Sequence, residues 1–135
     1  MDLLAAMSVS ASGMRAQSAR IKAATENIAN ANSFAADGTG AYKRQVVYLQ
    51  ASPDKKTGLT SVQVTGIKRD QNTPTTLQYD PSNPMANAQG YVEKSNVDTQ
   101  IEAADMREAA RAYEANISAI ETAKQMMSSS LNLLR

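Results

Sequence analysis

Apolar residues recur at every seventh position near both ends of the chain. Near the amino terminus the series lies in a stretch with no Pro and a single Gly, residues 4–31, and consists of Met7, Met14, Ile21 and Ile28. Residues 99–134 contain neither Gly nor Pro, and two series interleave there: Met106, Tyr113, Ile120, Met127, Leu134 and Ala103, Ala110, Ile117, Lys124, Leu131. This spacing is typical of a helix that packs along another helix. We therefore predict two long helices, over residues 1–32 and 99–135.

The middle of the chain, residues 33–98, has a different pattern. It contains all four Pro and five of the six Gly, and its short apolar runs predict strands at 42–50, 62–65 and 75–79. Residues 53–58 have the composition of a hairpin turn, and residues 80–84 must be extended or turned because Pro disfavours helix in the preceding residue. The predicted fold is mainly α with a small β element, and its terminal helices form an antiparallel coiled-coil pair.

The apolar residues are mostly small. They make up 42% of the 135 residues, but Ala supplies 23 of them, while Leu, Ile, Val and Phe together supply only 22. Chains this poor in large apolar residues rarely build a sizeable core. Ala favours helices, whose narrow apolar faces then need partner helices. We therefore expect the chain to associate with copies of itself.

Charge and residue types exclude several functions. The formal net charge of +1 gives no field that attracts nucleic acid or an anionic membrane surface. The longest unbroken apolar run, residues 3–7, is too short for direct membrane insertion or for a cleavable secretory signal. The absence of Cys and His removes thiol chemistry, disulfides, the usual general base and the commonest metal ligand. We expect no enzyme activity and no nucleic-acid partner.

Two sets of charged residues remain as candidate ligand sites. Glu102, Asp105 and Glu108 form an acidic row, but no turn-rich loop or second ligand set accompanies it, as a calcium site requires. The basic pairs at 55–56 and 68–69 are flanked by acidic residues and suit solvated turns better than a phosphate site. We expect all these charges to lie on solvated faces, and we predict no cofactor, no metal and no catalytic residue.

Polar residues near the helix ends allow two interpretations. Asn27 and Asn30 lie where the first helix should stop, and Asn ends helices by adopting left-handed geometry or by bonding the local backbone. The alternative is that these side chains contact another subunit. Tyr113 and Asn116 lie one helical turn apart, and a local core role and an intersubunit contact fit them equally well.

Matched motifs stand at the two ends of the chain. They are SASGM at residues 10–14 and ENIANAN at 26–32, then SNVD at 95–98 and AYEAN at 112–116. This arrangement resembles the signatures shared by bacterial flagellar rod and hook proteins. In the middle, YDPSNPMA at 79–86 and GYV at 90–92 are similar to the short proximal rod members of that family.

The resemblance implies a structural subunit of the basal-body rod, the drive shaft that transmits torque across the periplasm. Its partners would be other copies of itself, other rod proteins and the flagellar type III export apparatus, which it would pass without a cleavable signal peptide. The implied assembly interface follows the heptad series and the helix-end signatures, and comprises Met7, Met14, Ile21, Asn27, Ile28, Asn30, Met106, Ala110, Tyr113, Asn116, Ile117, Ile120, Met127 and Leu131. The competing function is a freestanding coiled-coil adaptor or export chaperone.

Overall fold

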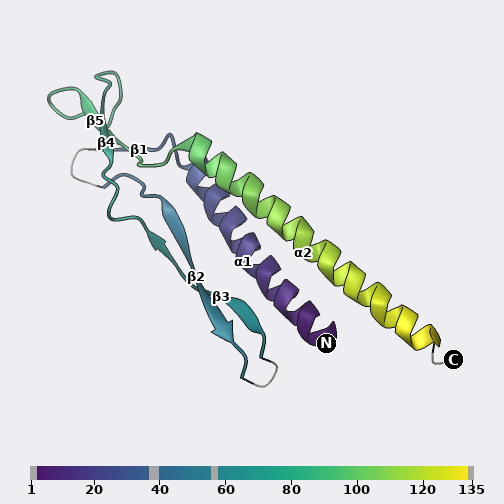
Figure 1. Cartoon of the computed structure of the whole chain (residues 1–135). Helices are drawn as coiled ribbons and strands as arrows, with labels where there is room; N and C mark the ends of the chain where they lie inside the picture. Colours follow the sequence, from purple (N-terminus) through teal and green to yellow (C-terminus); the bar gives the residue numbers. More distant parts are fainter. Residues whose placement is uncertain (1–2, 37–39, 56–57, 134–135) are drawn as a thin grey trace.

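The structure, a computed structural model, describes residues 3–36, 40–55 and 58–133. Two long helices, α1 (Leu3–Ala29) and α2 (Thr99–Leu133), lie side by side and run in opposite directions. Figure 1 shows that the amino- and carboxy-terminal ends therefore lie at the same end of the molecule. Helices of 27 and 35 residues are about 40 and 52 Å long, so the molecule is elongated.

The chain between the helices forms two small antiparallel sheets. Strands β2 (Gln45–Pro53) and β3 (Thr60–Arg69) make a hairpin that runs alongside α1 (Figure 1). The second sheet lies beyond the opposite end of the helix pair from the termini, and its strands in spatial order are β1 (Phe34–Ala35), β5 (Tyr91–Lys94) and β4 (Thr76–Tyr79).

Polar side chains mark where each helix begins or ends. At the start of α2, Asp98 Oδ1 accepts hydrogen bonds from the backbone N–H groups of Gln100 (2.9 Å) and Ile101 (3.3 Å), which a helix start otherwise leaves open. At the end of α1, the Asn30 side chain donates to the Glu26 carbonyl (2.8 Å). The sequence thus supplies a cap at both ends that face the small sheet.

Small residues fill the contact between the helices. Gly13 lies so close to α2 that a β-carbon added to it would sit 2.9 Å from Asn116 Nδ2. Small side chains let two backbones approach closely and make many weak dispersion contacts, which is how an Ala-rich chain holds two helices together. The buried residues of the pair are Ala5, Ser12, Ala16, Ala23, Ala24 and Asn27 on α1, with Glu102, Ala109 and Ala123 on α2.

The β2–β3 hairpin packs on α1, and within the described residues it makes no close backbone approach to α2. Its strands pair along their length, with a register shift between Tyr48 and Leu49. The hydroxyl of Ser12, buried in α1, accepts a hydrogen bond from the Val62 N–H (3.1 Å) and donates to the Val9 carbonyl (2.6 Å). This side chain therefore ties the hairpin to the first helix.

The small sheet is built around β5 and a tight loop. Val92 in β5 is fully buried, at 0% exposure. Gly90, just before β5, has a φ of 83°, and a β-carbon there would come within 2.8 Å of the Tyr79 ring. Only Gly meets both conditions. The rings of Tyr79 and Tyr91 pack edge to face, with centroids 5.2 Å apart.

The predicted fold class is confirmed at the level of two helices with a few antiparallel strands, while strand extents differ. The strands predicted at 42–50, 62–65 and 75–79 correspond to β2, β3 and β4, and the predicted hairpin is present. Strand β3 is longer because its polar ends also pair with β2. Strands β1 and β5 escaped prediction because two and four residues are too few to show an alternating pattern. Residues 1, 2, 56, 57, 134 and 135 of the predicted elements lie outside the described residues.

Candidate assembly interface and the polar junction beside it

A cluster of polar side chains joins α1, α2 and the start of β2 near the end of the helix pair that faces the small sheet. We call it the polar junction. Its members come from three distant parts of the sequence, so the cluster exists only in the folded chain. They are Asn27, Tyr42, Arg44, Gln45, Glu102 and Asp105.

Asn27 is the centre of the polar junction and is 0% exposed. Its Oδ1 accepts hydrogen bonds from the Tyr42 hydroxyl (2.9 Å) and the Gln45 backbone N–H (2.7 Å). Its Nδ2 donates to the Gln45 carbonyl and to Glu102 Oε2, both at 3.0 Å. Two acceptor lone pairs and two donor hydrogens are all that an amide offers. The side chain of Asn27 is therefore fully used inside the chain.

Arg44 supplies the positive charge that pairs with the two carboxylates of the polar junction. Its Nε donates to Glu102 Oε1, and its Nη2 lies 3.1 Å from Asp105 Oδ2. The Glu102 side chain is only 3% exposed, against 30% for Arg44. Removing one partner of a buried pair leaves an uncompensated charge, which costs about 3–5 kcal/mol. Arg44 is thus the group that allows a carboxylate to lie between the helices.

Tyr42 closes the junction on the side of the hairpin. The Arg69 guanidinium lies 4.9 Å from the centroid of its ring, which is within cation–π range. Burial raises the pKa of the Tyr42 hydroxyl above its ordinary value of 10.0. Because the pKa of Tyr42 is higher in the folded state, the contribution of its neutral hydroxyl to the free energy of unfolding is complete below pH 10.0. This contribution is lost as the pH rises through the folded-state pKa.

The prediction that the acidic row is solvated was wrong for Glu102, whose side chain is buried. Sequence reasoning also missed Arg44 altogether. Neither predicted heptad series contains Glu102, and only the structure shows that it lies seven residues before Ala109, which is 0% exposed, and therefore on the same buried line of α2. A carboxylate on such a line requires a cationic partner from elsewhere in the chain.

The basic pair at 68–69 also differs from prediction. Both residues lie in β3 rather than in a turn. Lys68 Nζ lies 5.6 Å from the centroid of the Tyr48 ring, and Arg69 covers Tyr42. The two cations therefore pack on the rings of Tyr48 and Tyr42. This pairing depends on strand register, which the linear sequence does not reveal.

The two open interpretations of the Asn residues resolve differently. Asn27 does not end α1, since it lies inside the helix and bonds within the chain. Asn30 bonds the local backbone at the helix end, and no described residue other than Gly has a positive φ. Asn116 donates to the Ala112 carbonyl (2.9 Å), and Tyr113 is half-buried.

The heptad series predicted to form the assembly interface are only partly covered within one chain. In α2 the buried residues Glu102, Ala109 and Ala123 fall one position before one predicted series. Leu131 is 62% exposed. The half-buried members are Met7, Met14, Ile21, Ile28, Met106, Ala110, Tyr113, Asn116, Ile117, Ile120 and Met127.

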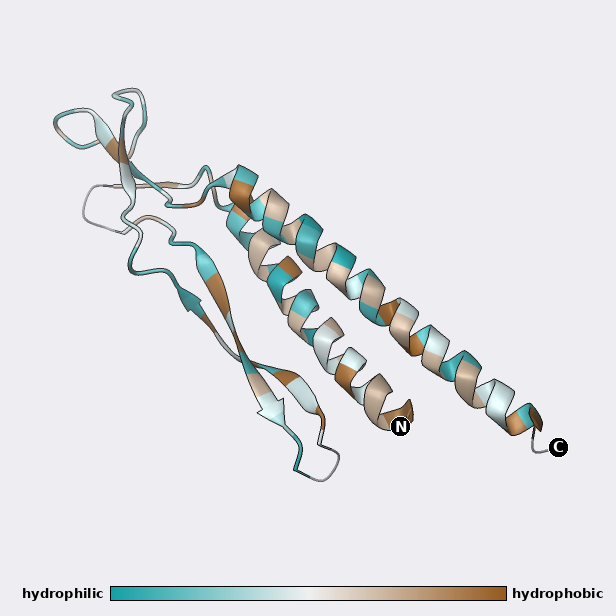
Figure 2. Ribbon diagram, in the orientation of Figure 1, coloured by the Kyte–Doolittle hydropathy of each residue, from teal (hydrophilic) through white to brown (hydrophobic). Residues whose placement is uncertain are grey.

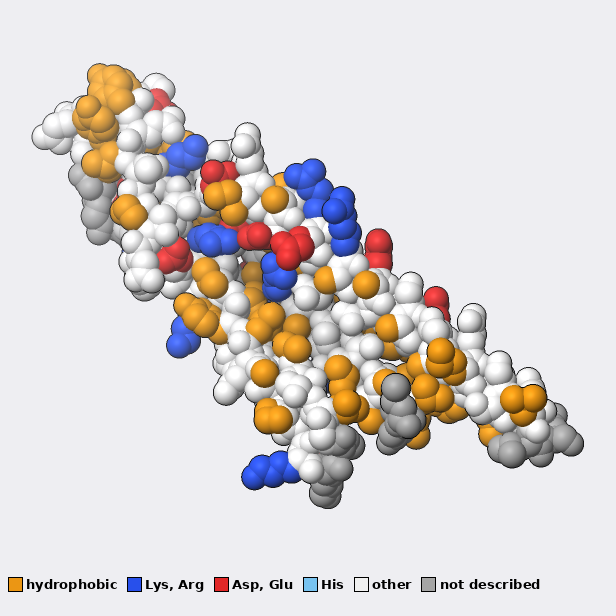
Figure 3. Space-filling model, in the orientation of Figure 1, with side chains coloured by type: hydrophobic (Ala, Val, Ile, Leu, Met, Phe, Trp, Pro, Cys, Tyr) orange, Lys and Arg blue, Asp and Glu red, His pale blue; other side chains and the backbone are white. Residues whose placement is uncertain are grey.

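The end of the helix pair next to the termini has a distinct composition. Residues 3–14 of α1 and 125–133 of α2 contain no charged side chain, and we call them the uncharged end. Figure 3 shows charged side chains along the rest of the pair and mostly orange or white atoms here, and Figure 2 shows the same contrast as hydropathy. Large apolar side chains point outward there: Leu4 (66% exposed), Met126 (55%), Leu131 (62%) and Leu133 (88%).

Comparison with known proteins identifies the family of the chain. Residues 88–133 match the family model described as the C-terminal region of the flagellar basal body rod FlgEFG proteins. The chain is 39% identical to the flagellar basal-body rod protein FlgC of Salmonella typhimurium, over 98% of both chains. It is 37% identical to FlgC of Agrobacterium fabrum (98% and 96% covered) and 31% identical to FlgC of Bacillus subtilis (94% and 95%). The chain belongs to the FlgC family.

As a member of the FlgC family, the chain is a structural subunit of the flagellar basal-body rod. The resemblance seen in the end signatures is thereby confirmed, and the adaptor or chaperone alternative receives no support. In this FlgC-family chain no helix among the described residues is both long and apolar enough to cross a bilayer. The described residues also contain no group of three acidic side chains placed to hold a metal ion.

Proposed function

We propose that the chain polymerises through its two terminal helices, which pack as coiled coils with the helices of neighbouring rod subunits. The observation that carries this proposal is the exposed surface. One chain exposes 9138 Å², whereas a compact monomer of 14.4 kDa is expected to expose about 6,800 Å². The excess is larger than the area that each partner buries in a standard protein interface, about 800 Å².

The pattern of partial burial supports coiled-coil packing between subunits. Met7, Met14, Ile21 and Ile28 lie on one line of α1 and remain half-buried in the single chain. A neighbouring helix would cover such a line by placing its own side chains between them. Met side chains are unbranched and adapt to differently shaped neighbours, which suits a subunit that meets several related rod proteins.

The proposal includes the finer role of a proximal rod subunit that transmits torque and that is exported by the flagellar type III apparatus. Three segments carry separate parts of this role: residues 1–32 and 99–135 provide the helices that pack with neighbouring subunits, and residues 33–98 form the β-rich segment between them. We assign no catalytic residue, since the buried charges of the polar junction are all paired with one another.

Motility complementation with basal-body isolation tests the proposal. Ile117→Asp places a carboxylate on a half-buried apolar line of α2, and its unpaired burial against a neighbour would cost several kcal/mol for each subunit. We expect loss of rods and of motility. Thr122→Asp, at an exposed position of the same helix, is the matched control and should support motility. Normal rods with Ile117→Asp would refute assembly through this face.

A further inference from the structure

Two of the end motifs, far apart in the sequence, meet at the middle of the helix pair. The motif at residues 10–14 contributes Gly13, and the motif at 112–116 contributes Asn116. A β-carbon added to Gly13 would lie 2.9 Å from Asn116 Nδ2 and 3.1 Å from Asn116 Oδ1. The first distance is shorter than real β-carbons adopt. The Asn116 amide therefore occupies the space that any other side chain at position 13 would need.

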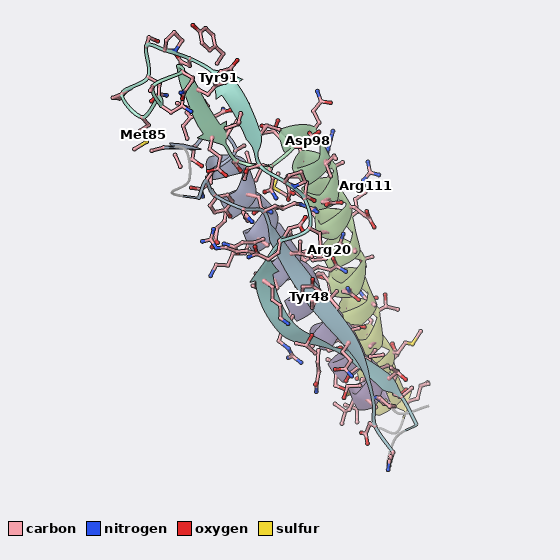
Figure 4. All side chains as sticks on the ribbon, turned by 90° about the vertical axis from the view of Figure 1, so that its left-hand side faces the viewer. Arg20, Tyr48, Met85, Tyr91, Asp98 and Arg111 are labelled. Carbon is pink, nitrogen blue, oxygen red and sulfur yellow. The ribbon has the colours of Figure 1, made fainter. Side chains whose placement is uncertain are left out.

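The second motif also holds the Asn116 side chain in place. Asn116 Nδ2 donates a hydrogen bond of 2.9 Å to the carbonyl of Ala112, the first residue of the same motif. Figure 4 shows Arg111 on the side of α2 that points away from α1 and the hairpin. Five residues along a helix change the direction of a side chain by about 140°. Asn116 therefore lies on the side of α2 that faces α1, with its amide oriented by its own helix.

This contact lies on the same line of each helix as the polar junction. Gly13 comes two heptads before Asn27, and Asn116 comes two heptads after Glu102. The side chains of Asn27 and Glu102 are hydrogen-bonded at 3.0 Å. The two contacts are therefore about 21 Å apart along the helix pair, and both bring the same line of α2 to α1.

Ala residues occupy two adjacent lines of α2, so small size alone does not decide which line faces α1. Ala109 (0% exposed) and Ala123 (8%) lie on the line of Asn116, whereas Ala103 and Ala110 lie on the adjacent line and are half-buried. Small side chains on either line would allow the helices to approach each other. A polar residue placed on an apolar line is one way in which a helix specifies how its partner packs.

We propose that Asn116, seated on Gly13, is the specificity-determining residue that makes its own line of α2 face α1 beyond the polar junction. The adjacent line has Ile117 at the corresponding position, and its branched side chain has one preferred orientation in a helix. Ile117 also has no polar group to bond the Ala112 carbonyl. The contact lies within one chain, so the inference goes beyond the proposed polymerisation, and failure of that proposal would leave it unchanged.

Thermal unfolding of the purified chain tests the contact by the sign of the change. Gly to Ala inside a helix ordinarily raises stability, because Ala has the higher helix propensity. Gly13→Ala should instead lower the melting temperature by about 4 °C, as overpacking predicts. Gly13→Ala/Asn116→Ala, which frees the space, should recover at least the wild-type value. Gly66→Ala in β3, where a β-carbon would have no atom within 4 Å, is the matched control and should not lower it.

Thiol labelling tests whether the contact orients α2, and single variants report single positions because the chain contains no Cys. In the Gly13→Ala background, Ala123→Cys should react with a maleimide at least about fivefold faster than in the wild-type background. Lys124→Cys, on the adjacent line, should react more slowly. Ala109→Cys, between the contact and the polar junction, is the matched control and should keep its rate.

Several results would overturn the inference. A Gly13→Ala chain that melts at or above the wild-type temperature would show that the amide does not fill the space. Equal acceleration at positions 109 and 123 would show a general loss of stability. Equal acceleration at 123 and 124 would show helices that separate without turning. Where a cysteine variant does not fold, amide hydrogen exchange of Gly13→Ala decides: residue 123 should exchange faster and residue 109 should not, and equal acceleration refutes the proposal.

Discussion

The two ends of the helix pair are held by different forces. At the polar junction, Asn27 and Arg44 connect three chain segments through directional bonds, and Glu102 is buried only because it is paired. At the uncharged end, small residues provide the close approach and large apolar residues such as Leu131 remain exposed. The comparison teaches that the side chains of one end are satisfied within the single chain, whereas the other end keeps large apolar side chains exposed, the surface that the proposed assembly would cover.

The largest expected effect comes from breaking the polar junction. Arg44→Met leaves Glu102 buried without its cation and should lower the free energy of unfolding by about 3–5 kcal/mol. Urea denaturation of the purified chain measures it. The double variant Arg44→Met/Glu102→Leu removes both charges and should recover much of the loss. A single variant as stable as the wild type would show that the junction does not hold this end together.

A smaller loss is expected where the hairpin meets the uncharged end. Ser12→Ala removes the acceptor for the Val62 N–H, and an unsatisfied buried donor costs about 1–3 kcal/mol. Ser8→Ala, which removes only a local bond to the Ala5 carbonyl, is the matched control. Hydrogen exchange of the Val62 amide should accelerate in the first variant and not in the second. Equal exchange rates of the Val62 amide in both variants would show that the Ser12 hydroxyl does not hold the hairpin on α1.

The smallest effect on the single chain is expected at Leu131. Since the side chain is 62% exposed, Leu131→Ser should change the free energy of unfolding by no more than about 0.5 kcal/mol. Motility should nevertheless fall, because the same side chain would be buried in the assembled rod. A large loss of monomer stability would contradict the exposed position of Leu131 in the single chain. Unchanged motility would contradict its burial in the assembled rod.

The sequence predicted the uncharged end better than it predicted the polar junction. Heptad spacing reports helices and their apolar lines directly, so both long helices were found from residues such as Met14 and Ile120. The junction depends on Arg44, which lies 58 residues from Glu102 and shares no periodic pattern with it. Its partners are set by the path of the chain after α1, and that path emerges only from tertiary packing.

Tertiary packing also explains why the buried residues of α2 lie one position before the predicted heptad series. Heptad counting weighs large apolar side chains and therefore selected Ile117, whereas the buried apolar residues of α2 are Ala109 and Ala123. Close approach favours the smallest side chains, and the larger ones are displaced to the edge of the contact. In the single chain Ile117 and Ile120 therefore stay half-buried.

The lack of ionisable groups at the uncharged end affects how its contacts respond to surroundings. Electrostatic contacts weaken as ionic strength rises, because the Debye length falls from about 10 Å at 0.1 M to about 3 Å at 1 M. Residues 3–14 and 125–133 carry no side-chain charge to screen and no side chain that titrates near neutrality. Packing through this end therefore keeps its strength when salt or acidity changes, so a shaft joined there would stay rigid in environments that would loosen a joint made of ion pairs.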